Sequence, residues 1–340
     1  MFATLVSGYP IDPLPGGVDD LREARRRHAE GSLDDVTYDA FVDAWVSSVV
    51  DEQVGSGLSL VCDAEARWVD GQLGLARDLL AGRTSPQDVV AAWRVADAAS
   101  DVLVKQVLPG PWSSALALAT RPSDRSAMRR DLTDVLAETA RHLVAERCHL
   151  IQLDEPAAAR APGSPEGAGE DLVEAVGRFV GQLPTGASVC VALPGGAPRP
   201  ELHRAIAALP VQSVLVDVTD GPDGWRCIDR LAPDQGVVVG ALDATTPVTD
   251  DAEMLVWAAA LAARMGDRGH ARVGIAPSGS LVGLERHRAR RKIEQLGLAV
   301  RLAAMGPLQA VAEALQPDPA NARIRGLPQL YRDWQEATHG

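Results

Sequence analysis

The stretch that decides the fold is His149-Leu150-Ile151-Gln152-Leu153-Asp154-Glu155-Pro156-Ala157. Residues 150–153 form a short apolar run with one polar residue in it, which is typical of a strand, and the proline ends that strand. Two adjacent carboxylates, Asp154 and Glu155, therefore stand where the strand must stop. One interpretation is a solvated loop that starts with two acids. A functional site is favoured because burial and mutual repulsion of acids are costly, and because other segments repeat this layout.

Short apolar runs recur along the chain and alternate with segments of helical periodicity. The apolar runs are residues 2–7, 58–62, 102–108, 150–153, 188–193, 213–218, 236–242 and 271–276. The helical segments include residues 21–29, 38–54, 131–146, 170–183, 250–265 and 284–305. Eight strands that alternate with helices predict an α/β fold, a (β/α)8 TIM barrel, and the alternative is a doubly wound open sheet.

The chain has 340 residues, of which 46% are hydrophobic, and this is enough for one large core. We therefore predict one barrel domain over residues 1–315. Within it, residues 18–55 are predicted to form a helical hairpin, and residues 316–340 a C-terminal extension on the surface. The Pro- and Gly-rich residues 160–169 predict a mobile loop over the pocket, with a linker between domains as the alternative.

Charge and hydropathy narrow the class of partner. Lys and Arg total 33 against 46 Asp and Glu, which gives a net charge of −13 and argues against binding of nucleic acid or acidic membranes. No run of 18 apolar residues occurs and the N-terminus lacks the order of a signal peptide, so we expect a soluble, cytoplasmic protein. The four scattered cysteines predict reduced thiols.

Polar or glycine clusters follow nearly every predicted strand, and in a barrel such clusters open on one face. One cluster contains Glu65, Arg67 and Asp70. A guanidinium beside Glu65 would keep this carboxylate ionised and ready to hold an ammonium, but an Arg67–Asp70 pair could instead cap the next helix. Lys105 lies inside an apolar run, so it should meet a carboxylate or point outward into the helix layer. No histidine is predicted at the carboxyl end of a strand, so a catalytic or metal-binding histidine is not expected.

In chain order, these clusters resemble the catalytic C-terminal barrel of the cobalamin-independent methionine synthase family, including its single-barrel forms. Residues 151–157 are similar to the family's IQIDEPAL strand almost letter for letter, and Val6-Ser7-Gly8-Tyr9-Pro10 is similar to its opening turn with Gly and Ser exchanged. Residues 240–243 resemble its GVID stretch, and residues 276–281 stand in the place of its PDCGL stretch. The resemblance covers roughly residues 2–305.

The resemblance implies a zinc ion that activates the homocysteine thiol for transfer of a methyl group from a methyl-folate. The family's zinc ligands match Cys190, Ala192, Asp217 and Gly279 here. Only Cys190 and Asp217 could coordinate, and two ligands do not make a stable zinc site. We therefore expect a divergent member that has lost its metal centre.

The amino-acid end of the family's site is better matched. Glu65 and Asp154 stand at the two carboxylates that bind the homocysteine ammonium, whereas Ser7 lies one residue before the family's carboxylate-binding serine, whose place is taken by Gly8. The resemblance therefore implies an amine-bearing, amino-acid-like small molecule as substrate.

Taken together, the residues and the resemblance predict a methionine-synthase-like methyl or one-carbon transferase that works without zinc, with a methyl-folate as one candidate donor. The candidate general bases are Asp154, Glu155 and Asp217. The candidate substrate-binding residues are Ser7, Tyr9, Glu65, Arg67, Trp112, Gln152, Asp154, Asp243 and Thr245. Methionine synthesis itself and a non-catalytic small-molecule-binding paralogue are the alternatives. A metal-free decarboxylase is disfavoured, because the strand ends are mostly acidic or neutral.

Overall fold

The structure, a computed structural model, describes residues 1–11, 21–68, 70–160 and 167–315. The strands are β1 (Phe2–Ala3), β2 (Leu60–Val61), β3 (Leu103–Val104), β4 (Gln106–Pro109), β5 (Leu150–Asp154), β6 (Ser188–Leu193), β7 (Ser213–Asp217), β8 (Gly236–Leu242) and β9 (Val273–Pro277). The α-helices are α1 (Leu21–Ala29), α2 (Asp35–Gly55), α3 (Gly71–Leu80), α4 (Pro86–Ala98), α5 (Pro111–Leu118), α6 (Arg125–Ala145), α7 (Ala157–Arg160), α8 (Ala168–Val180), α9 (His203–Ala207), α10 (Asp223–Arg230), α11 (Ala252–Arg264), α12 (Arg286–Ala303) and α13 (Leu308–Leu315). Short 3-10 helices η1 (Pro122–Asp124), η2 (Pro200–Leu202), η3 (Met265–Asp267) and η4 (His270–Arg272) complete the described part.

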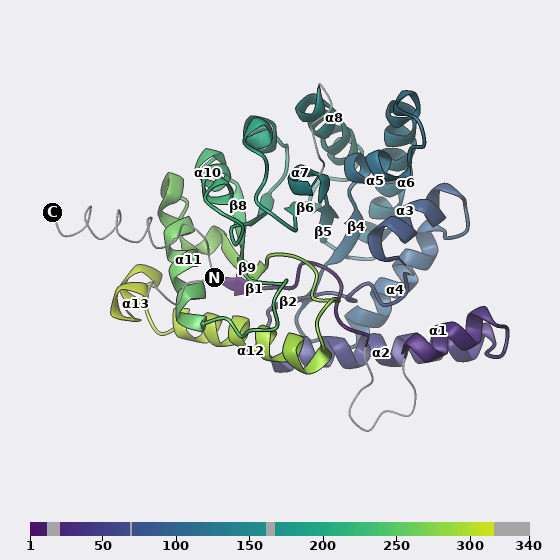
Figure 1. Cartoon of the computed structure of the whole chain (residues 1–340), viewed down its shortest axis with the longest axis horizontal. Coiled ribbons are helices and arrows are strands. Elements are labelled where there is room, and N and C mark those ends of the chain that lie inside the picture. The colour runs from purple at the N-terminus through teal and green to yellow at the C-terminus, as the bar shows by residue number, and fades with distance from the viewer. Residues whose placement is uncertain (12–20, 69, 161–166, 316–340) are drawn as a thin grey trace.

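The strands form a curled parallel sheet, and the helices surround it (Figure 1). Seven strands pair in the order β1-β9-β8-β7-β6-β5-β4, and β2 pairs with β3 in a separate two-stranded sheet. Every pairing is parallel, as expected where each strand is followed by a helical crossover. The predicted α/β fold is thus confirmed, and each of the eight predicted apolar runs contains residues of a β-strand.

Regular pairing does not continue around the whole ring of described strands, because the seven-stranded sheet has β1 and β4 at its two edges. Between β1 and β2 there is a single parallel bridge, from Thr4 to Leu60. The run at residues 102–108 is split into β3 and β4 at Lys105, whose backbone N–H donates to Val61 O at 2.9 Å. The physical reason is that β1 and β2 are only two residues long and that Lys105 interrupts the third run.

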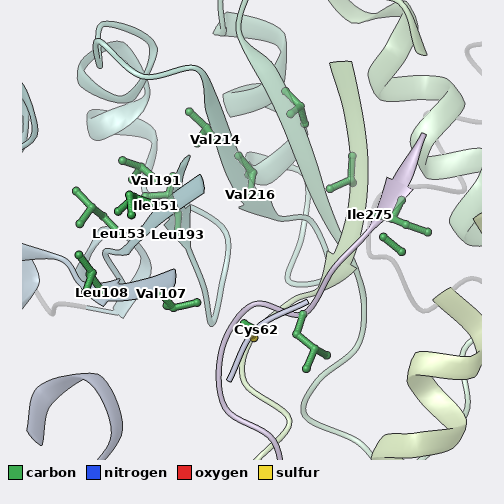
Figure 2. Close-up of a cluster of buried hydrophobic side chains, with 14 of the residues drawn as sticks. Cys62, Val107, Leu108, Ile151, Leu153, Val191, Leu193, Val214, Val216 and Ile275 are labelled. Carbon is green, nitrogen blue, oxygen red and sulfur yellow. The ribbon is translucent and has the colours of Figure 1, made fainter. Parts of the chain in front are cut away.

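Alternate side chains of the strands pack into two separate cores, because successive residues of a strand point to opposite faces of the sheet. The inner core is small and comes from the strands and the turn after β1: Val6, Ala192, Leu215, Val238 and Ala276. The outer core lies between the strands and the helices, and Figure 2 shows part of it, with Ile151 and Leu153 of β5 beside Val191 and Leu193 of β6. The sheet thus curls around its own side chains.

Helices α1 and α2 occupy most of the predicted hairpin at residues 18–55. The His28 ring of α1 stacks on the Tyr38 ring of α2, with centroids 4.3 Å apart, and Asp34 caps α2 by accepting the Thr37 N–H at 2.9 Å. Residues 18–20, the core of the predicted loop (161–166) and the predicted C-terminal extension lie outside the described residues. The hairpin as a folding unit stays a prediction.

In the described residues, no helix alone has the length and apolar character to cross a membrane, and only α12 and α13 taken together, bent by 113°, pass on length and composition.

Candidate functional site

A cavity of about 530 Å³ opens at the carboxyl ends of the strands. Its lining draws on the ends of several of them: Ser7 follows β1, Glu65 follows β2, Pro109 and Asp154 end β4 and β5, Pro194 follows β6 and Ser280 follows β9. Because carboxyl ends of parallel strands meet at one edge of the sheet, residues far apart in the chain come together here.

Glu65 and Asp154 both line this cavity and form an acid pair, with Ser7 lining it as well. The Ser7 hydroxyl lowers the pKa of both carboxyl groups, and Gln72 Nε2 donates to Glu65 Oε1 at 2.8 Å. Burial raises the pKa of Glu65 to about 8, with the charge of Asp154 adding to the shift, and burial raises the pKa of Asp154 to about 6. Two acids so placed resist full ionisation, and a bound cation would remove that cost.

The backbone at Glu65 is held in the left-handed region, with φ of 56° at Ala64 and 61° at Glu65. Non-glycine residues rarely adopt this conformation, and where they do the strain points to a functional constraint. Opposite, a Cβ on Gly8 would lie 2.8 Å from Ser280 Oγ and 3.2 Å from Glu65 Oε2. A glycine at position 8 therefore makes room for the Glu65 carboxylate.

Arg67 does not accompany Glu65, which corrects the sequence expectation that its guanidinium keeps Glu65 ionised. It forms ion pairs with Asp39 (3.3 Å) and Asp43 of α2. Asp70 pairs with Arg77 at 3.3 Å, so the alternative Arg67–Asp70 cap is wrong too. The reason is that α2, distant in sequence, presents carboxylates to the guanidinium.

Gln152 and Lys105 lie behind the acid pair, inside the ring of strands. Gln152 Nε2 donates to Asp154 Oδ1 at 2.6 Å and to Val6 O at 2.8 Å. Lys105 Nζ donates to Gln152 Oε1 and to Leu5 O, both at 2.5 Å. The expectation that Lys105 meets a carboxylate or points into the helix layer is therefore wrong, because the amide oxygen and a backbone carbonyl accept its N–H groups. Gln152 contacts Asp154 and not the cavity itself.

Glu155 lies under helix α5 and is fully buried. Its two oxygens accept the backbone N–H groups of Trp112 (3.1 Å) and Ser113 (2.7 Å), at the end of the helix where N–H groups lack partners. Burial raises its pKa to about 7. Trp112 is 1% exposed, so its contribution to the site comes from its backbone.

Tyr9 lines the cavity, and its hydroxyl is bound by a residue of α2. The hydroxyl donates to Glu52 Oε1 at 2.6 Å, and Arg286 donates to Glu52 Oε2 at 2.9 Å. Burial together with the Glu52 carboxylate raises the pKa of Tyr9. This buried triad fastens the turn after β1 to α2 and α12.

Asp217, Asp243 and Thr245 follow β7 and β8 and are not among the described residues that line the cavity. Asp217 accepts the N–H groups of Gly196 (2.7 Å) and Thr219 (2.8 Å), and burial raises its pKa. Asp243 accepts both the N–H and the hydroxyl of Thr245 at 2.7 Å. Burial works against ionisation of Asp243, but these bonds outweigh it and lower its pKa. Both acids therefore hold loops beside the cavity.

Sequence reasoning missed several residues of the cavity, of which Arg25 and Trp68 carry the most chemistry. Arg25 donates to Ala66 O, its Nε is buried without a partner, and it is the one cation among the described lining residues. Its signal was its helical spacing, because it lies one turn after buried Leu21. Leu73 and Val282 are exposed at the cavity's edge and form an apolar rim.

The residues at the family's zinc positions do not fit zinc. The described residues contain no group of three or more His, Cys, Asp and Glu side chains that could hold a metal ion. Cys190 packs against the inner core and burial raises the pKa of its thiol, whereas both oxygens of Asp217 are taken by N–H groups. Ala192 and Gly279 supply no donor.

No protein-family model matches the chain, and no curated protein matches it significantly. Among solved structures, a Listeria monocytogenes protein assigned as a vitamin-B12-independent methionine synthase is similar, with 14% identity, a TM-score of 0.65 and coverage of 94% of this chain and 100% of that one. A B12-independent methionine synthase from Shewanella sp. W3-18-1, in complex with selenomethionine, has 13% identity, a TM-score of 0.71 and coverage of 89% and 97%. At such identities the likeness shows a shared fold.

Proposed function

We propose that the chain is a methyl or other one-carbon transferase of the methionine-synthase type, with a (β/α)8 barrel, that acts without zinc on an amine-bearing, amino-acid-like molecule in the cytoplasm. The observation that carries the proposal is the acid pair: Glu65 and Asp154 line one cavity with an apolar rim, and burial raises the pKa of both. The fold shared with two proteins described as methionine synthases supports it.

The acid pair suits recognition of an ammonium group. Burial of both carboxylates makes two negative charges costly without a ligand, and an ammonium that donates to both removes much of that cost. The apolar rim at Leu73 and Val282 would then contact the remainder of the molecule. Arg25, on the same cavity wall, supplies a cation for a carboxylate of the ligand.

The two acids are also suited to proton transfer, because their environments separate their pKa values. In this proposal Asp154 is the ionised partner and Glu65 the protonated one, because burial and the charge of Asp154 both raise the pKa of Glu65, whereas Lys105 lowers that of Asp154. Asp154 would accept a proton from the substrate ammonium, the freed nitrogen lone pair would form the bond to a methyl group, and the donor nitrogen would keep the electrons of the broken bond. Glu65 would supply the proton that this donor nitrogen, for example that of a methyl-folate, then needs.

The other predicted bases receive different roles in this proposal. Glu155 holds the first turn of α5, and Asp217 holds the loops after β6 and β7. Their oxygens are occupied by N–H donors, which leaves Asp154 as the base. We assign positioning roles to Glu155 and Asp217.

The test uses L-methionine as probe, because the Shewanella structure holds its selenium analogue. Calorimetry should show binding of L-methionine and at least tenfold weaker binding of 4-(methylthio)butanoate, which lacks the amine. Glu65→Gln and Asp154→Asn should each weaken L-methionine binding by a similar factor, whereas Glu313→Gln, an exposed acid of α13, should leave it unchanged. Equal binding of the two probes would contradict recognition of the amine.

Turnover separates the enzyme from its alternatives. With a chelator present, transfer of a labelled methyl group from 5-methyltetrahydrofolate to an amine acceptor is the expected activity, and Asp154→Asn should abolish it. A protein that binds L-methionine but transfers no methyl group would be the non-catalytic paralogue. Stoichiometric zinc together with methyl transfer to homocysteine would identify a methionine synthase instead.

A further inference from the structure

We propose that Lys105 is a positioning residue for the acid pair, and that it acts through Gln152 to fix the orientation of the Asp154 carboxylate. The residues form a chain of hydrogen bonds from the break between β3 and β4 to β5: Lys105 Nζ to Gln152 Oε1 at 2.5 Å and Gln152 Nε2 to Asp154 Oδ1 at 2.6 Å. Asp154 and Glu65 both line the cavity, and the charge of Asp154 acts on Glu65. The identity of the ligand rests on the proposed function, but the network does not.

The donors leave Gln152 one way to point. An ammonium group can only donate hydrogen bonds, so the oxygen of the Gln152 amide must face Lys105. Both amide N–H groups then face the other side, where Val6 O (2.8 Å) and Asp154 Oδ1 accept them. Every polar atom of the buried amide is thereby satisfied, and a flipped amide would place N–H against ammonium.

Charge adds to this geometric effect. Lys105 is 4% exposed, and the titratable groups that act on it are Cys62, Cys190, Asp154 and Glu65. Burial lowers the pKa of Lys105, while its positive charge lowers the pKa of Asp154 against the effect of burial. Lys105 and Gln152 thus keep Asp154 able to ionise in a place where burial alone would leave it protonated.

Lys292 is a second buried lysine, but no amide stands between it and its carboxylate partner. It is fully buried in α12 and donates directly to Asp250 Oδ2 at 2.6 Å, away from the cavity lining. The direct carboxylate partner satisfies Lys292, whereas Lys105 reaches its nearest carboxylate through an amide. Lys292→Met is therefore a matched control with the same change and similar burial.

The experiment follows the carboxyl titration of Asp154 in the ligand-free protein by NMR of ¹³Cγ-labelled aspartate, with the signal assigned by its loss in Asp154→Asn. Lys105→Met should raise the titration midpoint by about one pH unit. Lys105→Arg, which keeps the charge and the donors, should restore most of the shift, and the cavity of about 70 Å³ beside Lys105 gives the longer side chain room. Lys292→Met should leave the midpoint unchanged.

A second variant and a binding measurement keep the test decisive. Gln152→Met cuts the link while Lys105 stays, and should also raise the midpoint; this result decides the matter if Lys105→Met does not fold. An unchanged midpoint in either variant, or an equal shift in Lys292→Met, would overturn the proposal. L-methionine binding at pH 7 should weaken about tenfold in Lys105→Met. If the unmodified protein does not bind L-methionine, the proposed function fails, and the titration still decides the role of Lys105.

Discussion

Glu65 combines three features that each lower the stability of the folded chain. Its φ is 61°, its carboxylate is largely buried, and a second acid, Asp154, stands close enough to raise its pKa. Strain and unfavourable electrostatics in one residue are typical of sites where function has been favoured over stability. The surrounding residues retain this arrangement, with Gly8 leaving space for the carboxylate and Gln72 donating to it.

At Arg25, the proposed contact with a ligand carboxylate predicts a selective effect. Arg25→Met should weaken binding of L-methionine roughly tenfold and leave binding of 3-(methylthio)propylamine, which lacks the carboxylate, almost unchanged. Calorimetry with both probes measures the difference. Arg22→Met, on an exposed position of the same helix, is the control. Equal losses for both probes would show that Arg25 only supports the fold.

Gly110 lies between the Asp154–Glu155 segment and helix α5, where there is no space for a side chain. We therefore expect even an alanine at this position to lower the stability strongly. A Cβ at this position would lie 2.2 Å from Glu155 Cδ and 2.4 Å from Asp154 O. Gly110→Ala should therefore cost about 3 kcal/mol in the free energy of unfolding, measured with urea. Gly177→Ala is the control: it lies in α8 with nothing within 4 Å, so alanine should stabilise the chain by about 0.5–1 kcal/mol.

At the scale of elements, helix α5 depends on a residue that is distant in sequence. Its first turn has no side-chain cap of its own, and Glu155 accepts two of its N–H groups. Glu155→Gln would turn an amide group toward these donors and lose one bond. We expect faster amide hydrogen exchange at Trp112 and Ser113 and a loss of about 2 kcal/mol in stability. Glu138→Gln, exposed on α6, should change neither; unchanged exchange in Glu155→Gln would contradict the assignment.

The sequence predicted elements well where local pattern decides them. The run at residues 236–242 matches β8, residues 188–193 match β6 and residues 21–29 match α1. Helix α5 was not predicted, because its N-terminus is completed by Glu155 and not by a nearby cap. The break between β3 and β4 was missed for the same kind of reason, since the partners of Lys105 lie in β5 and beside β1.

At the scale of the molecule, the parallel topology explains why the site was partly predictable. Placing strand ends on one edge was enough to bring Ser7, Glu65 and Asp154 together on the cavity. The same rule did not separate residues that face the cavity from those that hold its walls, such as Asp217 and Glu155. That distinction depends on which backbone N–H groups each carboxylate meets, and these come from loops whose shape no local pattern encodes.

The buried acids of the site predict how stability varies with pH. Burial raises the pKa of Asp154 to about 6, of Glu155 to about 7 and of Glu65 to about 8. Asp63, a buried acid shortly after β2, also has its pKa raised by burial to about 6. A carboxyl group with a raised folded-state pKa binds its proton more tightly when folded, so its contribution is fully present below its unfolded pKa and is lost as pH rises through the folded pKa. The melting temperature should therefore fall between pH 4.5 and 8.5.

The variant Glu65→Gln isolates one of these groups, because the remaining titrations occur in both proteins. Its difference in stability from the unmodified chain should grow with pH in favour of the variant, by on the order of 3 kcal/mol between pH 5 and 8.5. For a chain of this size that corresponds to roughly 5 °C in melting temperature by calorimetry. Glu313→Gln, at an exposed position of α13, is the control. A difference for Glu65→Gln that is constant with pH, or that grows toward acid, would mean that the ionised form of Glu65 is already stabilised in the empty cavity. An ammonium would then gain nothing by relieving the electrostatic cost of the two acids, which contradicts the proposed mode of binding.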